Sequence, residues 1–488
     1  MICRRNRSAD SQINFYKISK SMIRMLLKIF LFTSFIATTI SSVQAQQTEL
    51  LKNAPVAGQI TSRNAVNLTG TIELELSNGV TVIIKSTDFK DDEVVLRASR
   101  FGGTSNYPLK DLYNARYAGA IQSSMGYGEF APPDLQKLLS GKKISIGGQI
   151  SETRDYYIGN STVKDMEMMF QLLYLKVTSP RKDTALFSAY IKKQISASAK
   201  SLANPQSAFM DTLGQFVYNN NPLRSISVPK PSDFDHIDME RAHNIFRERM
   251  GDVAGMVFVI AGSFTEEQIV PLLEKYVASL PANGMKTAYV DRKVRPVNGN
   301  KLFKYNIGKE QKSLVVQLFS GEVPYSQDLD LKAIAMMEVL NLRIIEEIHD
   351  KRQAIYGGSM QGGLTREPYS NYSFLTFLPT EPEKVDTVLT ALKEEIKMLQ
   401  DKGPSKELLD KVKKQFVEVH REQLRDNNAW VSKLLAAKLE KDNIERFLHY
   451  ETYLNKLTTE DVKSAAKQLL ATSNMITAVQ LPELSTGY

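Results

Sequence analysis

Histidines are the residues of this sequence best suited to metal or acid–base chemistry, and there are five: His236, His243, His349, His420 and His449. A hydrolytic zinc site typically uses two histidines one helical turn apart, with a glutamate acting as the base. No two of the five are spaced as H-E-x-x-H or H-x-x-E-H. His236 and His243 lie seven residues apart, but no glutamate or cysteine completes a ligand set, so we interpret both as solvated surface histidines. The sequence therefore predicts no metal site and no cofactor.

A glycine-rich run at residues 357–363, with the sequence GGSMQGG, could in principle bind phosphate. It lacks the lysine and the serine or threonine of a phosphate loop, and its glycines are in the wrong order for a dinucleotide fingerprint. Glycines of this kind favour turns and the close approach of neighbouring strands. We therefore interpret the run as structural.

The first 45 residues are typical of a secretory leader. Arg24 and Lys28 form a basic region, residues 29–40 an apolar region, and Val43-Gln44-Ala45 a cleavage site before Gln46. The apolar run is short for a membrane span, so an uncleaved anchor is the weaker alternative. We expect a cleavable signal peptide and an exported chain, periplasmic or extracellular.

Removal of this leader changes the charge of the chain. The leader holds seven of the 62 Lys and Arg and one of the 54 Asp and Glu, which leaves 55 bases and 53 acids, a net charge of +2. Nucleic-acid binding needs a concentrated basic surface, so we expect no nucleic-acid partner. The single cysteine, Cys3, is removed with these 45 residues, so the mature chain has no disulfide.

Hydrophobic periodicity organises the rest of the chain. Residues 46–68 are polar and predict a flexible lead-in. Asn78-Gly79 is a hairpin signal between alternating apolar runs at 71–76 and 80–84. Further strands are predicted at 94–98, 257–261, 313–319, 373–378 and 475–480, and helices at 163–177, 184–201, 238–250, 265–280, 329–348 and 383–401. These elements divide the chain into a signal peptide (1–45), a lead-in (46–68), a first α+β lobe (69–283), a linker (284–300) and a second α+β lobe (301–488).

An internal repeat links the two lobes. Ile237-Asp238 opens a helix that runs into the strand after Met256, and about 220 residues later Leu457-Thr458 opens a helix that runs into the strand from Met475. A strand followed by Thr-Glu also occurs twice, at Thr265 and Thr380. Such patterns are common in α+β proteins, but their repetition in the same order favours duplication. We predict two similar lobes, each a mostly antiparallel sheet with helices packed on one face.

After residue 68 the chain resembles the insulinase/pitrilysin (inverzincin) zinc peptidases. Residues 257–264, followed by Leu280-Pro281, are similar to that family's strand, Gly-Asp-Phe-type turn and helix, with Ser263 where aspartate is usual. Residues 348–356 are similar to its I-R-E-K-x-x-x-x-Y block. The family has two similar halves, of which one carries H-x-x-E-H and the zinc. The segment 107–116, where the metal helix would lie, offers no ligand, so the chain looks like the other, non-catalytic C-terminal-type half.

The resemblance implies a substrate-gripping role for Tyr356, with His349 in place of the family's arginine seven residues earlier. A tyrosine hydroxyl can donate a hydrogen bond to a peptide carbonyl or an oxyanion. Histidine lacks the permanent charge and forked geometry of arginine, and Arg352 could supply them only where the helix has ended. The alternative is structural: Tyr356 begins a strand and His349 ends an exposed helix.

Three functions are consistent with these features. The first is a non-catalytic half, inactive alone, that completes a zinc-bearing peptidase subunit and binds extended peptides through a sheet edge. The second is a scaffold or binding protein with this fold and no proteolytic role. The third is a remnant of a longer two-half peptidase. No stable membrane insertion is expected in any of them.

Overall fold

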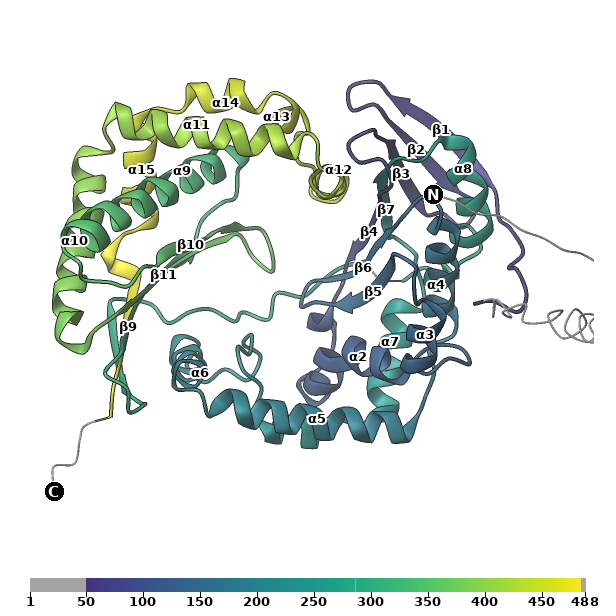
Figure 1. Cartoon of the computed structure of the whole chain (residues 1–488), viewed down its shortest axis with the longest axis horizontal. Coiled ribbons are helices and arrows are strands. Elements are labelled where there is room, and N and C mark those ends of the chain that lie inside the picture. Colours follow the sequence, from purple (N-terminus) through teal and green to yellow (C-terminus); the bar gives the residue numbers. More distant parts are fainter. Residues whose placement is uncertain (1–49, 286, 484–488) are drawn as a thin grey trace, which may run out of the picture. The chain divides into compact units, whose positions relative to one another are not determined.

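The structure is a computed structural model that describes residues 50–285 and 287–483 (Figure 1). The predicted signal peptide at 1–45 lies outside the described residues. Both β-sheets belong to one compact unit that begins at Asn53.

The first sheet has seven strands in the order β1-β2-β3-β7-β4-β6-β5. The predicted hairpin forms, because β2 pairs antiparallel with β3 on either side of Asn78-Gly79. The flexible lead-in predicted at 46–68 is wrong for its last part: β1 pairs antiparallel with β2, and its mostly exposed, polar residues had hidden the strand. The strand bounds are β1 Ile60–Val66, β2 Thr71–Leu76, β3 Thr81–Ser86, β4 Val94–Phe101, β5 Ile144–Ile150, β6 Arg154–Ser161 and β7 Val257–Gly262.

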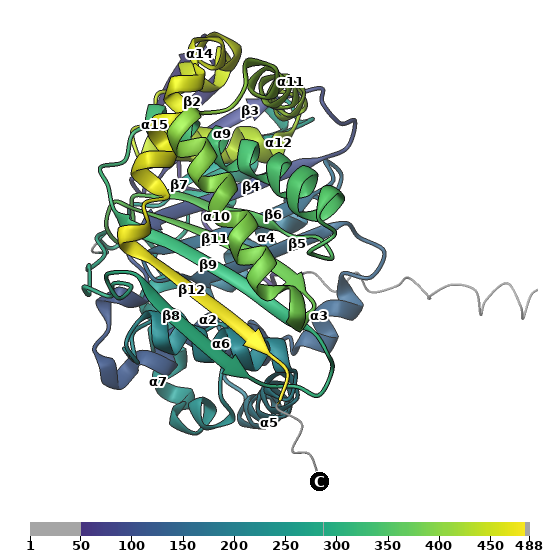
Figure 2. The same ribbon diagram turned by 90° about the vertical axis from the view of Figure 1, so that its left-hand side faces the viewer.

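The second sheet has five strands in the order β10-β11-β9-β12-β8. Figure 2 shows this sheet with α10 and α15 lying over it. The central strand β9 is buried along most of its length, as expected for a strand covered on both faces. The strand bounds are β8 Lys301–Asn306, β9 Ser313–Glu322, β10 Ser359–Thr365, β11 Asn371–Thr380 and β12 Met475–Leu481.

Both sheets share one topology. The order β3-β7-β4-β6-β5 in the first matches β8-β12-β9-β11-β10 in the second. Each has one parallel neighbour pair at the same place, β3 with β7 and β8 with β12, while the other neighbours in these series are antiparallel. The predicted α+β fold with two similar, mostly antiparallel lobes is thereby confirmed.

In each half, helices pack on the sheet of the same half. In the first half α2, α4 and α7 contact β5, and in the second half α9, α10 and α15 pack on β9. The helix bounds are α2 Leu112–Met125, α3 Pro132–Leu138, α4 Met166–Thr178, α5 Thr184–Leu202, α6 Pro205–Val217, α7 Met239–Met250, α8 Glu266–Leu272, α9 Gln327–Arg343, α10 Val385–Lys402, α11 Lys406–Gln423, α12 Asn427–Leu439, α13 Glu445–Leu448, α14 Tyr450–Lys456 and α15 Thr459–Leu469.

Two helices pack on the sheet of the other half. Phe209 and Leu213 of α6 pack against Leu314 and Val316 of β9, on the face opposite α10. In the reverse direction, Trp430 of α12 and its neighbours pack against strands β3, β4 and β7 of the first sheet. Figure 1 shows α12 beside β3 and β7. Each half therefore completes the core of the other. The predicted lobe limits at 283 and 301 stay a prediction.

Candidate functional site

The three residues predicted to grip a substrate lie where α9 ends. A π-helical segment, Ile344–Lys351, continues α9, contains His349 and ends before Arg352. The chain then turns back into the core, so that Ala354 and Ile355 are buried, whereas Tyr356 is 57% exposed. The backbone N–H of Tyr356 donates to the carbonyl of Pro379 at 3.0 Å, beside the end of β11.

Each of the three side chains contacts a different carboxylate. The His349 imidazole Nδ1 lies 2.7 Å from the Asp350 carboxylate, and the Arg352 guanidinium donates to Glu394 of α10 at 2.6 Å. The Tyr356 hydroxyl lies 3.5 Å from Glu381, which is a weak hydrogen bond. The structure places the three residues on one segment but does not join their side chains to one another.

The carboxylate beside Tyr356 is held in its charged form. Lys384 pairs with Glu381 at 2.9 Å, and this hydrogen bond keeps the pKa of Glu381 below its ordinary value. An ionised carboxylate only accepts, so the Tyr356 hydroxyl is the donor in this contact. Because the contact is long and exposed, the hydroxyl is available to a better acceptor.

A groove of about 610 Å³ begins beside Tyr356. Pro379, whose carbonyl accepts the Tyr356 N–H, lines the groove with Phe377 of the same strand. Its polar lining comes from separate elements: Asn204 and Gln206 at the start of α6, Lys309, Glu310 and Lys312 between β8 and β9, Ser313 at the start of β9, and Gln480 of β12. Amide and ammonium groups suit the carbonyls and carboxylates of a peptide chain.

Equivalent edge strands of the two sheets carry paired glycines. β5 contains Gly147-Gly148 and β10 contains Gly362-Gly363, and each strand is the last of its sheet. A Cβ added at Gly147 or Gly363 would meet no atom within 4 Å, so the space over both strands is open. A free edge with glycines allows another backbone to approach and pair.

An ion network joins the hairpins that follow these two edge strands. Arg154, at the start of β6, binds Glu367 in the β10–β11 turn and donates to Glu440 after α12 at 2.7 Å. Thr153 also donates to Glu367, at 2.7 Å, and Arg366 pairs with Glu440. These charges are half-buried, and a network of this kind fixes geometry more than it adds stability. It holds the edge of the first sheet close to the edge of the second.

The residues present do not fit a zinc ion. The family resemblance places the metal-binding helix after β4. The α-helix there is α2, and it contains neither histidine nor an acidic residue. Across residues 50–285 and 287–483, no three His, Cys, Asp or Glu side chains lie close enough to hold a metal. We therefore derive no metal-assisted step from this chain.

One histidine differs from its predicted environment. His236 ends a 3₁₀ turn and is exposed, stacked on Tyr113 with ring centroids 5.5 Å apart. His243 was predicted to be a surface residue, but it is 4% exposed on α7 and its Nδ1 lies 2.8 Å from Gln122 of α2. The hydrogen bond with the Gln122 amide satisfies the imidazole, which is why the ring can be buried. The same burial lowers the pKa of His243.

Comparison with known proteins identifies the class. Residues 238–416 match the family model of the peptidase M16 inactive domain. The probable zinc protease PqqL of Escherichia coli (strain K12) is 22% identical over 447 residues, covering 89% of this chain and 46% of that protein. The structure of the periplasmic protease PqqL from Escherichia coli has a TM-score of 0.77, with 19% identity over 91% of this chain and 48% of that one. A peptidase M16 inactive domain from Pseudomonas fluorescens has a TM-score of 0.71 at 15% identity, covering 86% of this chain and 99% of that one.

These findings place the chain among the relatives of zinc peptidases. It is similar to proteases of the PqqL type, and its residues 238–416 match the M16 inactive domain, so the family resemblance is confirmed. The chain spans about half the length of the curated relatives it matches. In the described part of the chain, no helix is long and apolar enough to cross a membrane.

Sequence reasoning missed the groove and the ion network. Their residues come from elements far apart in the sequence, as Asn204 and Lys309 or Arg154 and Glu367 do, and no local spacing reports such a contact. One signal was present: the Gly-Gly pair of 147–148 repeats that of 362–363. Read with the internal repeat, it would have indicated two equivalent edge strands.

Proposed function

We propose that this chain is the non-catalytic, peptide-binding half of an M16-type zinc peptidase, and that it completes an active partner subunit. The observation that carries the proposal is a pair of open, glycine-containing edge strands in a fold of the M16 type whose α2 lacks metal ligands. A half without ligands can contribute substrate contacts, whereas the metal-activated water must come from elsewhere.

In this proposal an extended peptide pairs with the edge of β10 after Met360, whose own backbone N–H and carbonyl are already bound by the Asn341 amide. Main-chain hydrogen bonds supply affinity, as in other cases of strand addition. The exposed hydroxyl of Tyr356 donates to a peptide carbonyl, and the adjacent groove with Lys309 and Lys312 accepts the following residues. Arg352 supplies the positive charge of the grip, and His349 a further hydrogen-bonding group, once the peptide displaces their present carboxylate partners.

The decisive experiment is to purify the tagged chain from its own cells and identify what accompanies it. A co-purifying subunit that carries H-x-x-E-H, together with cleavage of a fluorogenic peptide by the pair, supports the proposal. A stable partner without that motif, and no cleavage, favours the scaffold function. Recovery of this chain only as part of one longer polypeptide would favour a remnant or segment of a two-half peptidase.

We further propose that the chain acts outside the cytoplasm. Two observations support export: the leader-like composition of residues 1–45, and the periplasmic location stated for the Escherichia coli protease PqqL. N-terminal sequencing of the mature chain tests it, since cleavage after Ala45 would leave Gln46 first. A mature chain that still begins before Met22 would contradict the proposal.

A further inference from the structure

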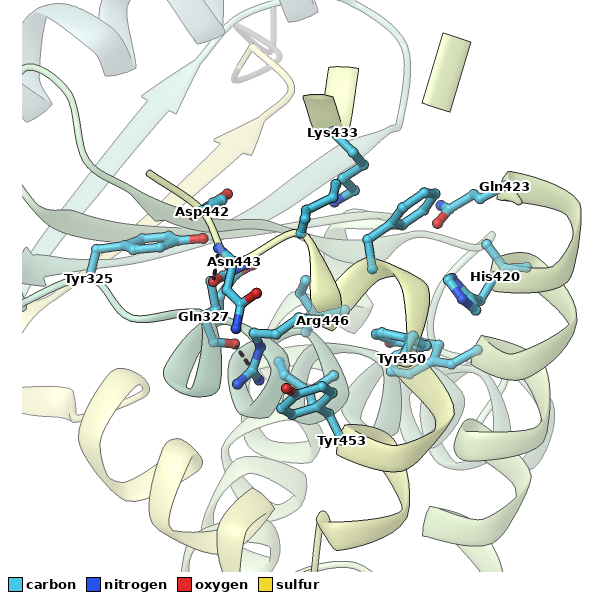
Figure 3. A pocket seen from close by; sticks show the side chains of 17 residues that line it. Tyr325, Gln327, His420, Gln423, Lys433, Asp442, Asn443, Arg446, Tyr450 and Tyr453 are labelled. Carbon is cyan, nitrogen blue, oxygen red and sulfur yellow. Dashed lines mark hydrogen bonds between the residues drawn. The ribbon is translucent and has the colours of Figure 1, made fainter. Parts of the chain in front are cut away.

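A cavity of about 300 Å³ lies among the helices of the second half, separate from the grip residues. Figure 3 shows it lined by side chains from α11, α12, α14 and the loop before α13. Its walls are largely apolar and aromatic: Leu331, Ile334, Phe416, Phe447, Tyr450 and Tyr453. This volume lies at the lower end of the range for small-molecule sites, which are typically apolar with a few convergent polar groups.

Five polar side chains that line this cavity form no hydrogen bond, ion pair or cation–π contact with any residue that the structure describes. Asp330, His420, Gln423, Lys433 and the Tyr450 hydroxyl form no hydrogen bond or ion pair with any residue in the ranges 50–285 and 287–483. Their neighbours in the same wall are paired: Asp442 binds Arg366, and Arg446 binds Asp328 at 2.7 Å. The hydroxyls of Tyr325 and Tyr453 likewise form no hydrogen bond with a described residue, but each ring contacts an arginine.

His420 is the most buried of the five. It is 3% exposed, with its ring centroid 4.8 Å from Tyr450 and 5.4 Å, edge-on, from Phe447. Burial lowers the pKa of His420, which favours the neutral ring with one donor and one acceptor. His420 lines the cavity, so a ligand in the cavity can bind this donor or this acceptor.

Asp330 and Lys433 give the cavity two opposite charges. Asp330 is half-buried in the first turns of α9, and burial raises the pKa of its carboxyl, against the opposing effect of nearby Lys433. The two do not form an ion pair with each other, although they line one cavity. A ligand with a single charge would leave the other group unpaired, whereas a ligand that carries both charges would satisfy the two together.

We propose that this cavity binds a small zwitterion with an apolar body, a free amino acid or a dipeptide. The Asp330 carboxylate accepts from the ligand ammonium, and the Lys433 ammonium donates to the ligand carboxylate. The apolar body lies against Phe447 and Tyr450, while His420 and Gln423 bind the remaining polar atoms. The inference goes beyond the proposed function, because it needs neither a partner subunit nor Tyr356.

Calorimetric titration of the mature chain tests the ligand class. The probes are L-leucine, L-phenylalanine and the dipeptide Leu-Leu, compared with leucinamide, which lacks the carboxylate, and N-acetyl-leucine, which lacks the ammonium. We expect at least one of the three zwitterions to bind, and each blocked analogue of leucine to bind at least about tenfold more weakly, because it loses one charge-assisted hydrogen bond. Failure of all three zwitterions to bind, or equal binding of the blocked analogues, would overturn the proposal.

Two substitutions locate the binding in this cavity. Asp330→Asn and Lys433→Gln should each weaken zwitterion binding at least about tenfold, whereas Asp410→Asn and Lys414→Gln, on the exposed surface of α11, should leave it unchanged. Asp330→Asn removes a half-buried charge without a partner, so its thermal midpoint should stay equal or rise while binding is lost. Equal loss of binding in the α11 controls, or full binding by both cavity variants, would show that the zwitterion does not bind in this cavity.

Discussion

The Tyr356 hydroxyl is exposed and only weakly engaged, since its single contact, to Glu381, is 3.5 Å long. If it donates to the reacting peptide, Tyr356→Phe should reduce turnover by the reconstituted pair about 10- to 1000-fold, the range for loss of one oxyanion-type donor. Steady-state kinetics with a fluorogenic peptide measure the loss. Tyr174→Phe on α4 is the matched control and should change nothing.

His349 permits a second test on the same segment. His349→Arg restores a permanent charge seven residues before Tyr356, and we expect turnover to stay equal or increase. Circular dichroism and pair assembly serve as folding controls, because the site is exposed and the present partner, Asp350, would also pair with arginine. Unchanged turnover in both Tyr356→Phe and His349→Arg would leave these residues with structural roles and favour the scaffold function.

Lys176 of α4 is a buried cation with a measurable effect on stability. It is 9% exposed, its ammonium lies 3.8 Å from the centroid of the Tyr127 ring, and burial lowers its pKa from 10.5 to about 8. Because the folded-state pKa is the lower one, the folded chain resists protonation. The resulting penalty is complete below pH 8 and disappears as the pH rises to about 10.5.

We therefore expect Lys176→Met to raise the free energy of unfolding at pH 7 by up to about 3 kcal/mol, the equivalent of this pKa difference. The gain should decline as the pH rises from 8 towards 10.5. Urea denaturation of the variant and the parent at both ends of this range measures it, with Lys192→Met on exposed α5 as the control. A gain that is the same at both pH values would show that the pKa of Lys176 is not lowered.

At the scale of elements, α6 and α12 connect the two halves, because each packs on the sheet of the other half. Trp430 is the centre of the α12 contact: it is 6% exposed, lies edge-on to Phe447 at 5.2 Å and donates from its indole to Leu424 at 3.0 Å. Trp430→Ala should cost about 3–5 kcal/mol of stability, as for other large buried aromatics. The exposed Leu109→Ala should cost less than about 0.5 kcal/mol.

Phe209→Ala in α6 tests the reverse contact by the same urea denaturation. Phe209 is fully buried and packs 6.0 Å from Phe303 of β8, so a loss of similar size is expected. If either half folded independently of the other, the two substitutions would each affect only one of two separate transitions. A single transition that both substitutions shift would instead indicate that the exchanged helices couple the halves.

Local signals predicted most elements correctly. Asn78-Gly79 gave the β2–β3 hairpin, and Asp238, whose side chain accepts from Arg241 N–H, caps α7 as its position suggested. The repeat of α7–β7 in α15–β12 is also confirmed, because these strands hold the same position in their sheets. The second predicted repeat, a strand followed by Thr-Glu, was wrong. Thr265 follows β7, but Thr380 ends β11, whose counterpart is β6. A strand followed by a capped helix is too common to identify equivalent positions.

The site was less predictable than the fold. The family resemblance indicated the segment that holds His349, Arg352 and Tyr356, and their role in binding stays a prediction. Neither the carboxylates that contact these residues, Glu394 and Glu381, nor the groove beside Pro379 could be predicted from the sequence. Both depend on how α10 and β11 pack. Contacts between distant elements follow from tertiary packing, which spacing in one chain does not report.

For the whole molecule, the chain spans 46% of the probable zinc protease PqqL and matches the fold of an M16 inactive domain over 99% of that domain's length. If the chain is the non-catalytic half proposed above, it takes part in hydrolysis only through the metal of another half. The purified mature chain should therefore hold no stoichiometric zinc and cleave no peptide by itself, because a water that is nucleophilic at neutral pH requires a metal to lower its pKa. Elemental analysis and a peptidase assay, each with and without chelator, measure both properties. One tightly bound zinc per chain together with chelator-sensitive cleavage would contradict the non-catalytic assignment and would require ligands outside residues 50–285 and 287–483.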